Sequence, residues 1–323
     1  MNMNDFFITA QEPWVRYRYL IDIMNLSIDD PRAISAKNEL LNHPHVRLLI
    51  EELKLWPGQP LNSHKSASQL YHKLVFLADL GLTDQDLYIS LITQKVCQNQ
   101  TDEGLYTLPN QISVAHGGTN EILWAWALCD APLLLYAVHM MSPKKDQETK
   151  KGVNYLLNLG RENGYPCVVS SALGNFRGPG RKSDPCPYAT LIMLKLISCF
   201  DELKMSTQAK GAVESLLNLW ETSKQNHPYI FYMGHDFRKL KAPLIWYDIL
   251  HVCDVLSHFD YARSDYRFKE MIGIITSKQN EMGLYTAESI WLPFRAWDFG
   301  QKKSPSLWIT FLINRILKRL GVV

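Results

Sequence analysis

The chain has 323 residues, of which 46% are apolar and 20% are charged, and its formal net charge at pH 7 is +2. This length allows a large buried core. The near-neutral charge gives no general reason to expect nucleic acid or an anionic membrane surface as a partner. No stretch approaches the run of apolar residues that a membrane-spanning helix requires. We therefore expect a globular protein with no nucleic-acid partner and no membrane span.

The six cysteines are scattered through apolar helical contexts, which is typical of reduced thiols and not of a disulfide framework. They are Cys97, Cys129, Cys167, Cys186, Cys199 and Cys253. The first residues, MNMNDFFITAQEP, lack the basic start and apolar run of a secretory signal. We therefore expect a cytoplasmic protein.

Residues 1–90 have the apolar periodicity of helices and almost no alternating strand pattern. The helical segments are PWVRYRYLIDIM, HPHVRLLIEELKLW and SASQLYHKLVFLADLGL. The clearest loop is WPGQPLNSHK, at residues 56–65. We expect an N-terminal helical portion, at residues 1–90, that closes or covers the rest of the structure.

Residues 91–323 repeat a pair of helices. In each repeat an almost wholly apolar helix begins just after a proline, which suits the first turn of a helix. The four prolines, at intervals of roughly 55 to 62 residues, are Pro132, Pro187, Pro243 and Pro305. A helix that is apolar on all sides is buried, so these four are expected to be inner helices.

Between the inner helices lies a more polar helix that runs into a Gly-aromatic turn, as in ITQKVCQNQTDEGLYT and IGIITSKQNEMGLYT. Helical hairpins that recur at such a period stack so that each completes its neighbour's core. The final helix, WITFLINRILKRL, is still strongly apolar, and closing the array into a ring would cover it. We therefore predict an all-α protein with a single domain over residues 1–323, an α/α toroid of inner and outer helices.

One group of residues is suited to a metal ion. Asp184 and Cys186 lie two residues apart at the start of the inner helix at Pro187, and His251 is expected about two turns into the next inner helix. A carboxylate, a thiol and an imidazole can hold zinc and leave a fourth position open for chemistry, and Asp248 could orient the histidine. A helix N-cap, a buried thiol and a core histidine would explain the same residues without a metal.

Cationic side chains gather in the loops that enter three of the inner helices. They are Arg177, Arg181, Lys182, Arg238, Lys239, Lys241, Lys302 and Lys303. In a ring these loops open on the same end, and the helix N-termini behind them add positive potential. We predict a site there for phosphate or carboxylate groups; the alternative is a rim of solvated charges.

Large aromatic residues lie in or just before the inner helices. They are Trp124, Trp126, Tyr136, Trp246, Tyr247 and Trp308. Such side chains could line a cavity of isoprenoid size, with Trp246 and Trp308 as the expected substrate contacts. Each would serve equally well in a hydrophobic core.

The segment GNFRGPGRKSDPCPY resembles the G-G-F-x-G-R-x-x-K run and the D-x-C-Y motif of protein prenyltransferase β subunits, which are α/α toroids. In that family the aspartate and the cysteine bind catalytic zinc, and a D-x-x-H-x-C motif one repeat later supplies the third ligand. Residues 248–253 match this second motif, so the resemblance implies Asp184, Cys186 and His251 as zinc ligands. Residues 115–118, Ala-His-Gly-Gly, match a family segment whose histidine contacts the isoprenoid diphosphate.

The resemblance implies a zinc-dependent, prenyltransferase-like enzyme that binds an anionic isoprenoid diphosphate in the toroid cavity. Zinc would bind and deprotonate an acceptor thiol or hydroxyl, and the acceptor could belong to a peptide or protein. Charge on the departing diphosphate would be stabilised by His116, Arg181, Lys182 and Tyr188. Tyr188 and Asp248 are the expected catalytic residues.

Two alternatives stay open. One is a terpene cyclase-like or lyase-like enzyme that uses the same cavity; terpene cyclases belong to the same toroid superfamily, but their clustered aspartates are absent here. The other is a non-catalytic module that binds an anionic lipid or a peptide. A set of zinc ligands with an open position favours an enzyme, because a binding module has no need of one.

Overall fold

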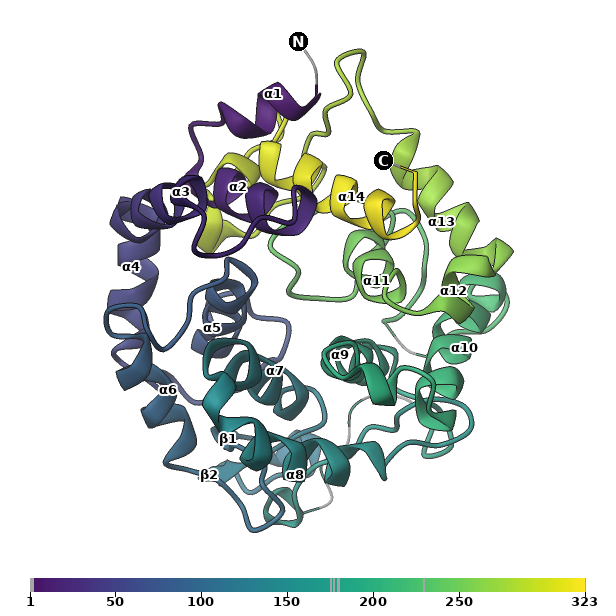
Figure 1. Ribbon diagram of the computed structural model, residues 1–323. Coiled ribbons are helices and arrows are strands. Elements are labelled where there is room, and N and C mark those ends of the chain that lie inside the picture. The colour runs from purple at the N-terminus through teal and green to yellow at the C-terminus, as the bar shows by residue number, and fades with distance from the viewer. Residues whose placement is uncertain (1–2, 175, 177, 179–180, 229, 323) are drawn as a thin grey trace. The chain divides into compact units, whose positions relative to one another are not determined.

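The computed structural model describes residues 3–174, 176, 178, 181–228 and 230–322 (Figure 1). These residues are mostly helical, with one two-stranded sheet among them, which confirms the predicted helical class. None of the described helices combines the length and the apolar content needed to cross a membrane.

The backbone contacts of the chain form two compact units. Unit 1 comprises Met1–Glu51 and His235–Val323, and unit 2 comprises Glu52–Gly234. We describe each unit by itself. The single domain expected over residues 1–323 stays a prediction.

Unit 2 contains three buried helices that pack in sequence order (Figure 1). They are α5 (Leu70–Asp79), α7 (Ala131–Met141) and α9 (Pro187–Ile197), and α7 contacts both of the others. Every residue of α9 is buried, as the almost wholly apolar sequence predicts. Pro132 and Pro187 lie in the first turns of α7 and α9, which confirms these two predicted starts.

Three amphipathic helices cover the buried ones. They are α6 (Ile89–Cys97), α8 (Asp146–Leu157) and α10 (Thr207–Thr222). Each buries one face and exposes the other. Both α6 and α8 pack on α7, and α10 packs on α9. Unit 2 therefore contains the inner and outer helices that the repeats predict.

A hairpin that the sequence pattern does not predict precedes α7. β1 (Leu108–Gln111) pairs antiparallel with β2 (Ile122–Ala125). The buried Asn110 side chain donates from Nδ2 to two carbonyl groups of the hairpin, at 2.9 and 3.0 Å. The sequence LPNQ lacks the alternation of apolar and polar residues that marks a strand. The loop of the hairpin carries residues 116–118, His-Gly-Gly.

Unit 1 combines the N-terminal helices with the C-terminal ones, and α14 packs on both α2 and α11. The helices are α1 (Met3–Ile8), α2 (Pro13–Arg18), α3 (Pro31–Asn42), α4 (Pro44–Leu53), α11 (Ile249–Leu256), α12 (Asp260–Ser264), α13 (Tyr266–Thr276) and α14 (Leu307–Arg319). The start of α14 is close to the one predicted at Pro305, and Ser306 caps it.

The inner helix expected at Pro243 begins later than predicted. α11 starts at Ile249, and the Asp248 carboxylate accepts a hydrogen bond from the backbone N–H of His251 (Oδ1–N 3.0 Å). A capping aspartate defines a helix start, whereas a proline only suits the first turn. His251 is therefore the third residue of the helix. The prediction that it lies about two turns inside the helix was wrong.

A buried polar contact joins the three inner helices of unit 2. Asp79, the last residue of α5, accepts hydrogen bonds from the Tyr136 hydroxyl of α7 (2.6 Å) and from the Lys195 ammonium of α9 (3.0 Å). The ammonium also lies over the Tyr136 ring, 4.5 Å from its centroid. Only 6% of the Lys195 side chain and 12% of the Asp79 side chain are exposed, so water screens this ion pair little. We name Asp79, Tyr136 and Lys195 the inner-helix anchor.

Lys195→Met should lower the free energy of unfolding by about 3 to 5 kcal/mol, because the Asp79 carboxylate would stay buried without its cation. Asp79→Asn combined with Lys195→Met should recover most of that loss, since no buried charge remains. Chemical denaturation provides the measurement. Lys204→Met is the control: it removes a 2.7 Å ion pair with the exposed Asp201 and should cost less than about 1 kcal/mol. Equal losses for the two lysine variants would contradict a buried anchor.

Candidate functional site

The N-terminal ends of α5, α7 and α9 lie together in unit 2. Tyr71 and Tyr188, the second residues of α5 and α9, share a hydrogen bond between their hydroxyl groups. His64 Nε2, in the loop before α5, lies 2.8 Å from a carboxylate oxygen of Asp130, the residue before α7. The inner-helix anchor joins the same three helices farther along the chain. The three helices therefore run in the same direction, and their first turns meet at one place.

Backbone hydrogen bonds align the two loops that lead into α7 and α9. The N–H of Leu128 donates to the carbonyl of Val168 (2.9 Å), and the N–H of Cys186 donates to the carbonyl of Tyr165 (2.7 Å). Residues 165–168 thus bridge the two loops. The loop before α7, residues 165–168 and the loop before α9 each contribute one cysteine to this region.

Those cysteines, all partly exposed, are Cys129, Cys167 and Cys186. The Cys129 thiol donates a hydrogen bond to the Cys186 sulfur, which lowers the pKa of Cys186 and raises the pKa of Cys129. The backbone N–H groups of Ala189 and Tyr188, at the start of α9, lower the pKa of Cys186 further. Cys186 is therefore the more easily ionised thiol of the pair.

Asp130 is fully buried, and both of its carboxylate oxygens are engaged. One oxygen faces His64, and the other accepts a hydrogen bond from the N–H of Ala127 (3.1 Å). The Tyr71 hydroxyl lies 3.0 Å from the carbonyl oxygen of His64, to which it can donate. Burial raises the pKa values of Tyr71 and Tyr188, so both hydroxyls stay protonated at neutral pH. We name the following residues the unit 2 polar cluster: His64, Tyr71, Cys129, Asp130, Cys186 and Tyr188.

The unit 2 polar cluster holds a nucleophile and an acid–base group. Cys186, whose pKa is lowered, is the candidate nucleophile, and the His64 imidazole, oriented by Asp130, could accept or donate a proton. As residues, Cys129 and Cys186 are partly exposed, as is 16% of the His64 side chain, so a ligand could reach the cluster at His64. Tyr188 is fully buried, so its hydroxyl contacts the cluster on the side away from solvent.

Cys186 and Tyr188 were predicted from the sequence as site residues, and the other four members of the cluster were not. One signal was present in the sequence. Cys129 and Asp130 stand just before the inner helix at Pro132, as Cys186 stands just before the one at Pro187. Polar residues at the same point of two successive repeats indicate a shared site, because corresponding points of stacked repeats are neighbours.

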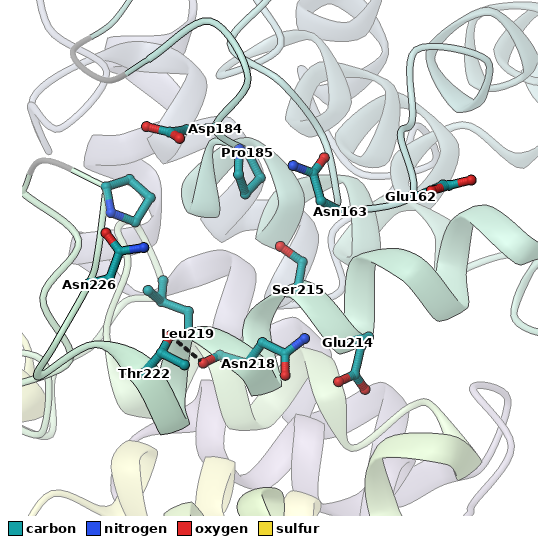
Figure 2. Close-up of a pocket in the computed structure, with 11 residues that line it drawn as sticks. Glu162, Asn163, Asp184, Pro185, Glu214, Ser215, Asn218, Leu219, Thr222 and Asn226 are labelled. Atoms are coloured by element: carbon teal, nitrogen blue, oxygen red, sulfur yellow. Dashed lines mark hydrogen bonds between the residues drawn. The ribbon is translucent and has the colours of Figure 1, made fainter.

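Asp184 is one of the residues that line a cavity beside α10 (Figure 2). Its Oδ2 accepts a hydrogen bond from the backbone N–H of Arg181 (2.9 Å). The cavity has a volume of about 220 Å³ and lies against α10; the residues that line it with Asp184 are Glu162, Asn163, Pro185, Glu214, Ser215, Asn218, Leu219, Thr222, Asn226 and Pro228. The sulfur of Cys186 faces Cys129.

In unit 1, His251 is held in a defined orientation. Its Nδ1 lies 2.8 Å from the carbonyl oxygen of Trp246, which can only accept, so in the neutral ring the proton sits on Nδ1 and the lone pair on Nε2. A backbone carbonyl holds many metal-binding histidines in this way. Burial raises the pKa of the neighbouring Asp248 to about 7. Among the described residues, none hydrogen-bonds to its second oxygen, Oδ2.

The predicted zinc ligands belong to two units: Asp184 and Cys186 to unit 2, and His251 to unit 1. Within the part of the chain that the structure describes, no three His, Cys, Asp or Glu side chains are grouped closely enough to hold a metal ion. The Cys186 thiolate and the His251 imidazole each have the chemistry of a zinc ligand. Asp184, Cys186 and His251 as the ligands of one zinc ion stay a prediction.

The predicted ligand-binding residues of unit 2 lie on two loops. Arg181 and Lys182 are exposed on the loop that enters α9. His116 is exposed on the hairpin loop, with its Nδ1 2.9 Å from the Ser113 hydroxyl. Arg177 lies outside the described residues.

The cations predicted in unit 1 differ in their surroundings. Lys239 forms a 2.6 Å ion pair with Asp236, and Arg238 is half-buried. Lys302 and Lys303 are exposed. Convergence of all these cations on one anion site stays a prediction, because they belong to two separately described units.

The two tryptophans predicted to contact substrate are both in unit 1. Trp308 is 1% exposed and stacks on Phe311, with 5.1 Å between ring centroids, so it packs in the core. Trp246 is partly buried, and its carbonyl holds His251. Trp291 was not predicted to take part in the site. The Lys241 ammonium nitrogen lies over its ring, 3.1 Å from the ring centroid.

No protein-family model matches the chain, and no curated protein matches it at a significant level. The likeness to prenyltransferase β subunits therefore rests on the short motifs alone. These motifs carry expectations about chemistry and do not establish a family.

The Asp248 carboxyl should make the stability of the fold depend on pH. Its pKa rises from 3.8 to about 7 on folding, so the folded state favours the protonated form, and the free energy of unfolding falls as pH rises through this window. Asp248→Asn keeps a capping side chain without a charge. In this variant the free energy of unfolding should no longer show the pH-dependent decrease of at most about 4 kcal/mol that Asp248 causes. Urea denaturation of both proteins at about pH 4 and about pH 8 measures the effect. A constant difference between the two proteins across this range would contradict the assignment.

Proposed function

We propose that the chain is a transferase-type enzyme that binds an anionic isoprenoid diphosphate at the unit 2 polar cluster. The observation that carries this proposal is the meeting of three helix N-termini near the Cys186 thiol and the His64 imidazole. The D-x-C motif that contains Cys186 and the His-Gly-Gly segment at residues 116–118 support the same class, because both resemble motifs of prenyltransferase β subunits.

The electrostatics of the cluster favour an anion. Three helices that run in the same direction place the positive ends of their dipoles together. The buried carboxylate of Asp130 already faces His64 and the N–H of Ala127, so its charge is partly offset. Arg181 and Lys182, exposed on the loop that enters α9, add positive potential. A diphosphate matches this set of groups.

The cluster residues divide into those that a ligand can reach and those that support them. His64 would donate a hydrogen bond to an oxygen of the departing diphosphate, and Asp130 would hold the imidazole in place. Cys186 would face the reacting carbon. Tyr71 and Tyr188 are buried against each other, so they would position the first turns of α5 and α9.

Zinc, the closed α/α toroid and the cytoplasmic location are parts of the proposal that rest on the sequence. Zinc would activate an acceptor thiol or hydroxyl. Cys186 suits zinc as a ligand, and Asp184 and His251 are the other ligands that the motifs imply. The order of packing in unit 2, from α5 through α7 to α9, supports the stacked hairpins from which a toroid is built.

Pyrophosphate should raise the melting temperature of the protein at low salt. An isoprenoid diphosphate should raise it more, because burial of its tail contributes about 0.8 kcal/mol of binding free energy per methylene. The shift should shrink with added salt, since exposed charges are screened beyond about 8 to 10 Å. Arg181→Ala combined with Lys182→Ala should reduce the shift. Scanning fluorimetry at several salt concentrations measures all three effects.

The matched control is Lys144→Ala combined with Lys145→Ala. Lys144 is exposed and Lys145 is partly exposed; both follow the C-terminal end of α7 and so mark the opposite end of the inner helices. The control removes the same charge and should leave the shift unchanged. If the two double variants behave alike, or if wild type shows no shift at low salt, the proposed anion site is refuted.

Elemental analysis tests zinc separately. We expect about one zinc per chain, lost in Cys186→Ala and in Asp184→Asn, because the motifs imply both residues as ligands. Wild-type protein without zinc would refute the cofactor and leave the diphosphate test intact. Retention of zinc in Asp184→Asn would show that the carboxylate is not a ligand.

A further inference from the structure

Four aromatic rings of unit 1 form a closed cycle in which each ring contacts two others. The distances between ring centroids are 4.9 Å from Trp14 to His43, 4.9 Å from His43 to His45, 5.5 Å from His45 to Trp297, and 4.5 Å from Trp297 back to Trp14. The two indoles are buried, and the two histidines are partly exposed. We name these four residues the unit 1 ring cluster.

The unit 1 ring cluster joins three segments that are far apart in the sequence. Trp14 belongs to α2, the two histidines stand where α3 ends and α4 begins, and Trp297 lies in the loop before α14. Because the histidines are partly exposed, protons can reach their rings from solvent. A change of charge on an imidazole therefore acts on the contacts between the N-terminal helices and the C-terminal segment of this unit.

The His43 imidazole also caps α4. His43 precedes Pro44, the first residue of the helix, and its Nδ1 lies 3.2 Å from the backbone nitrogen of His45. A backbone N–H can only donate, so Nδ1 accepts, and the proton of the neutral ring sits on Nε2. Protonation puts an N–H at Nδ1 that faces the N–H of His45. The helix then loses its side-chain cap, and a cation lies against a second imidazole.

We propose that the unit 1 ring cluster is an acid-sensitive latch, in which protonation of His43 opens the junction between α3 and α4. The inference is independent of the proposed function, because all four rings belong to unit 1 and the proposed anion site belongs to unit 2. It requires no ligand and no metal ion.

The sign of the pH effect follows from the surroundings of His43. Burial and the neighbouring His45 lower the pKa of the His43 imidazole, so these two effects outweigh the attraction of the Trp14 indole for a cation. The closed junction therefore favours the neutral ring. Opening the junction exposes the ring to water and restores its ordinary pKa of about 6.5. The latch contributes its full stability above about pH 6.5 and loses it as the pH falls.

The other charged groups around the unit 1 ring cluster do not produce this response. Arg16 of α2 pairs with Glu39 of α3, and it stays charged throughout, as does Arg47 of α4. Burial raises the pKa values of Glu12, just before α2, and of Asp298, the residue after the cluster indole. The folded state favours the protonated form of these two carboxyls, so their contribution to stability falls as the pH rises. This sign is opposite to that of the latch.

Hydrogen–deuterium exchange measures the opening of the junction. The wild-type protein is labelled at about pH 7.5 and about pH 5.5, for times that give equal intrinsic exchange. Amide protection at residues 45–48 should fall by up to about tenfold at the lower pH, because the open form takes up a proton with a pKa of about 6.5. Protection in α13, a helix of the same unit, should not change.

Two substitutions of His43 separate the charge from the cap. His43→Asn keeps an acceptor for the N–H of His45 and cannot be protonated, so protection should be the same at both pH values. His43→Phe keeps a ring without an acceptor, so protection should already be low at about pH 7.5. The matched control is His235→Asn, since His235 is an exposed histidine of the same unit; it should behave as wild type.

Measurements on the wild-type protein keep the test valid even if a variant folds poorly. NMR titration of its rings should give His43 a pKa below about 6.5. The inference is overturned if that ring titrates at about 6.5 or above, if wild type keeps its protection at about pH 5.5, if His43→Asn retains the full decrease, or if His235→Asn removes it. Diphosphate binding enters none of these measurements, so failure here is distinct from failure of the proposed function.

Discussion

The buried ion pair between Asp79 and Lys195, with the Tyr136 hydroxyl on the same carboxylate, is the constraint on which unit 2 depends. The helices that it joins, α5, α7 and α9, have 10, 11 and 11 residues. At a rise of about 1.5 Å per residue their lengths are nearly equal. The anchor joins the last residue of α5 and the last turn of α9 to the middle of α7, and the N-terminal ends of the three helices meet on the other side of it. The unit 2 polar cluster lies where those ends meet, and its chemistry depends on that alignment.

Part of the fold could be predicted from the sequence because its signals are local. Wholly apolar segments after Pro132 and Pro187 specify both the helix type and its burial, and α7 and α9 form there. At Pro243 the same rule failed, because the Asp248 side chain caps a helix that starts at Ile249. A proline suits a first turn without requiring one, whereas a cap supplies a partner for an N–H group that would otherwise lack one.

The candidate site was predictable only in part, because its members come from the N-terminal helical portion and from two repeats. Cys186 could be found from the local D-x-C motif, but its contact with Cys129 depends on the packing of α7 against α9, which no local pattern encodes. Sequence spacing also pairs Asp184 with Cys186, and that pairing stays a prediction. The Asp184 carboxylate accepts a hydrogen bond from the N–H of Arg181, and the residue lines the cavity at α10. Spacing along the chain limits the distance between the Cα atoms of two residues, and the local backbone conformation sets the direction of each side chain.

The hydrogen bond between Tyr71 and Tyr188 reports most directly on the meeting of the helix ends, since it joins the first turns of α5 and α9. A double-mutant cycle with Tyr71→Phe and Tyr188→Phe, followed by chemical denaturation, measures their coupling without a ligand. We expect the double variant to lose about 0.5 to 1.5 kcal/mol less than the sum of the single losses. Strictly additive losses would contradict the convergence of α5 and α9, and with it the unit 2 polar cluster.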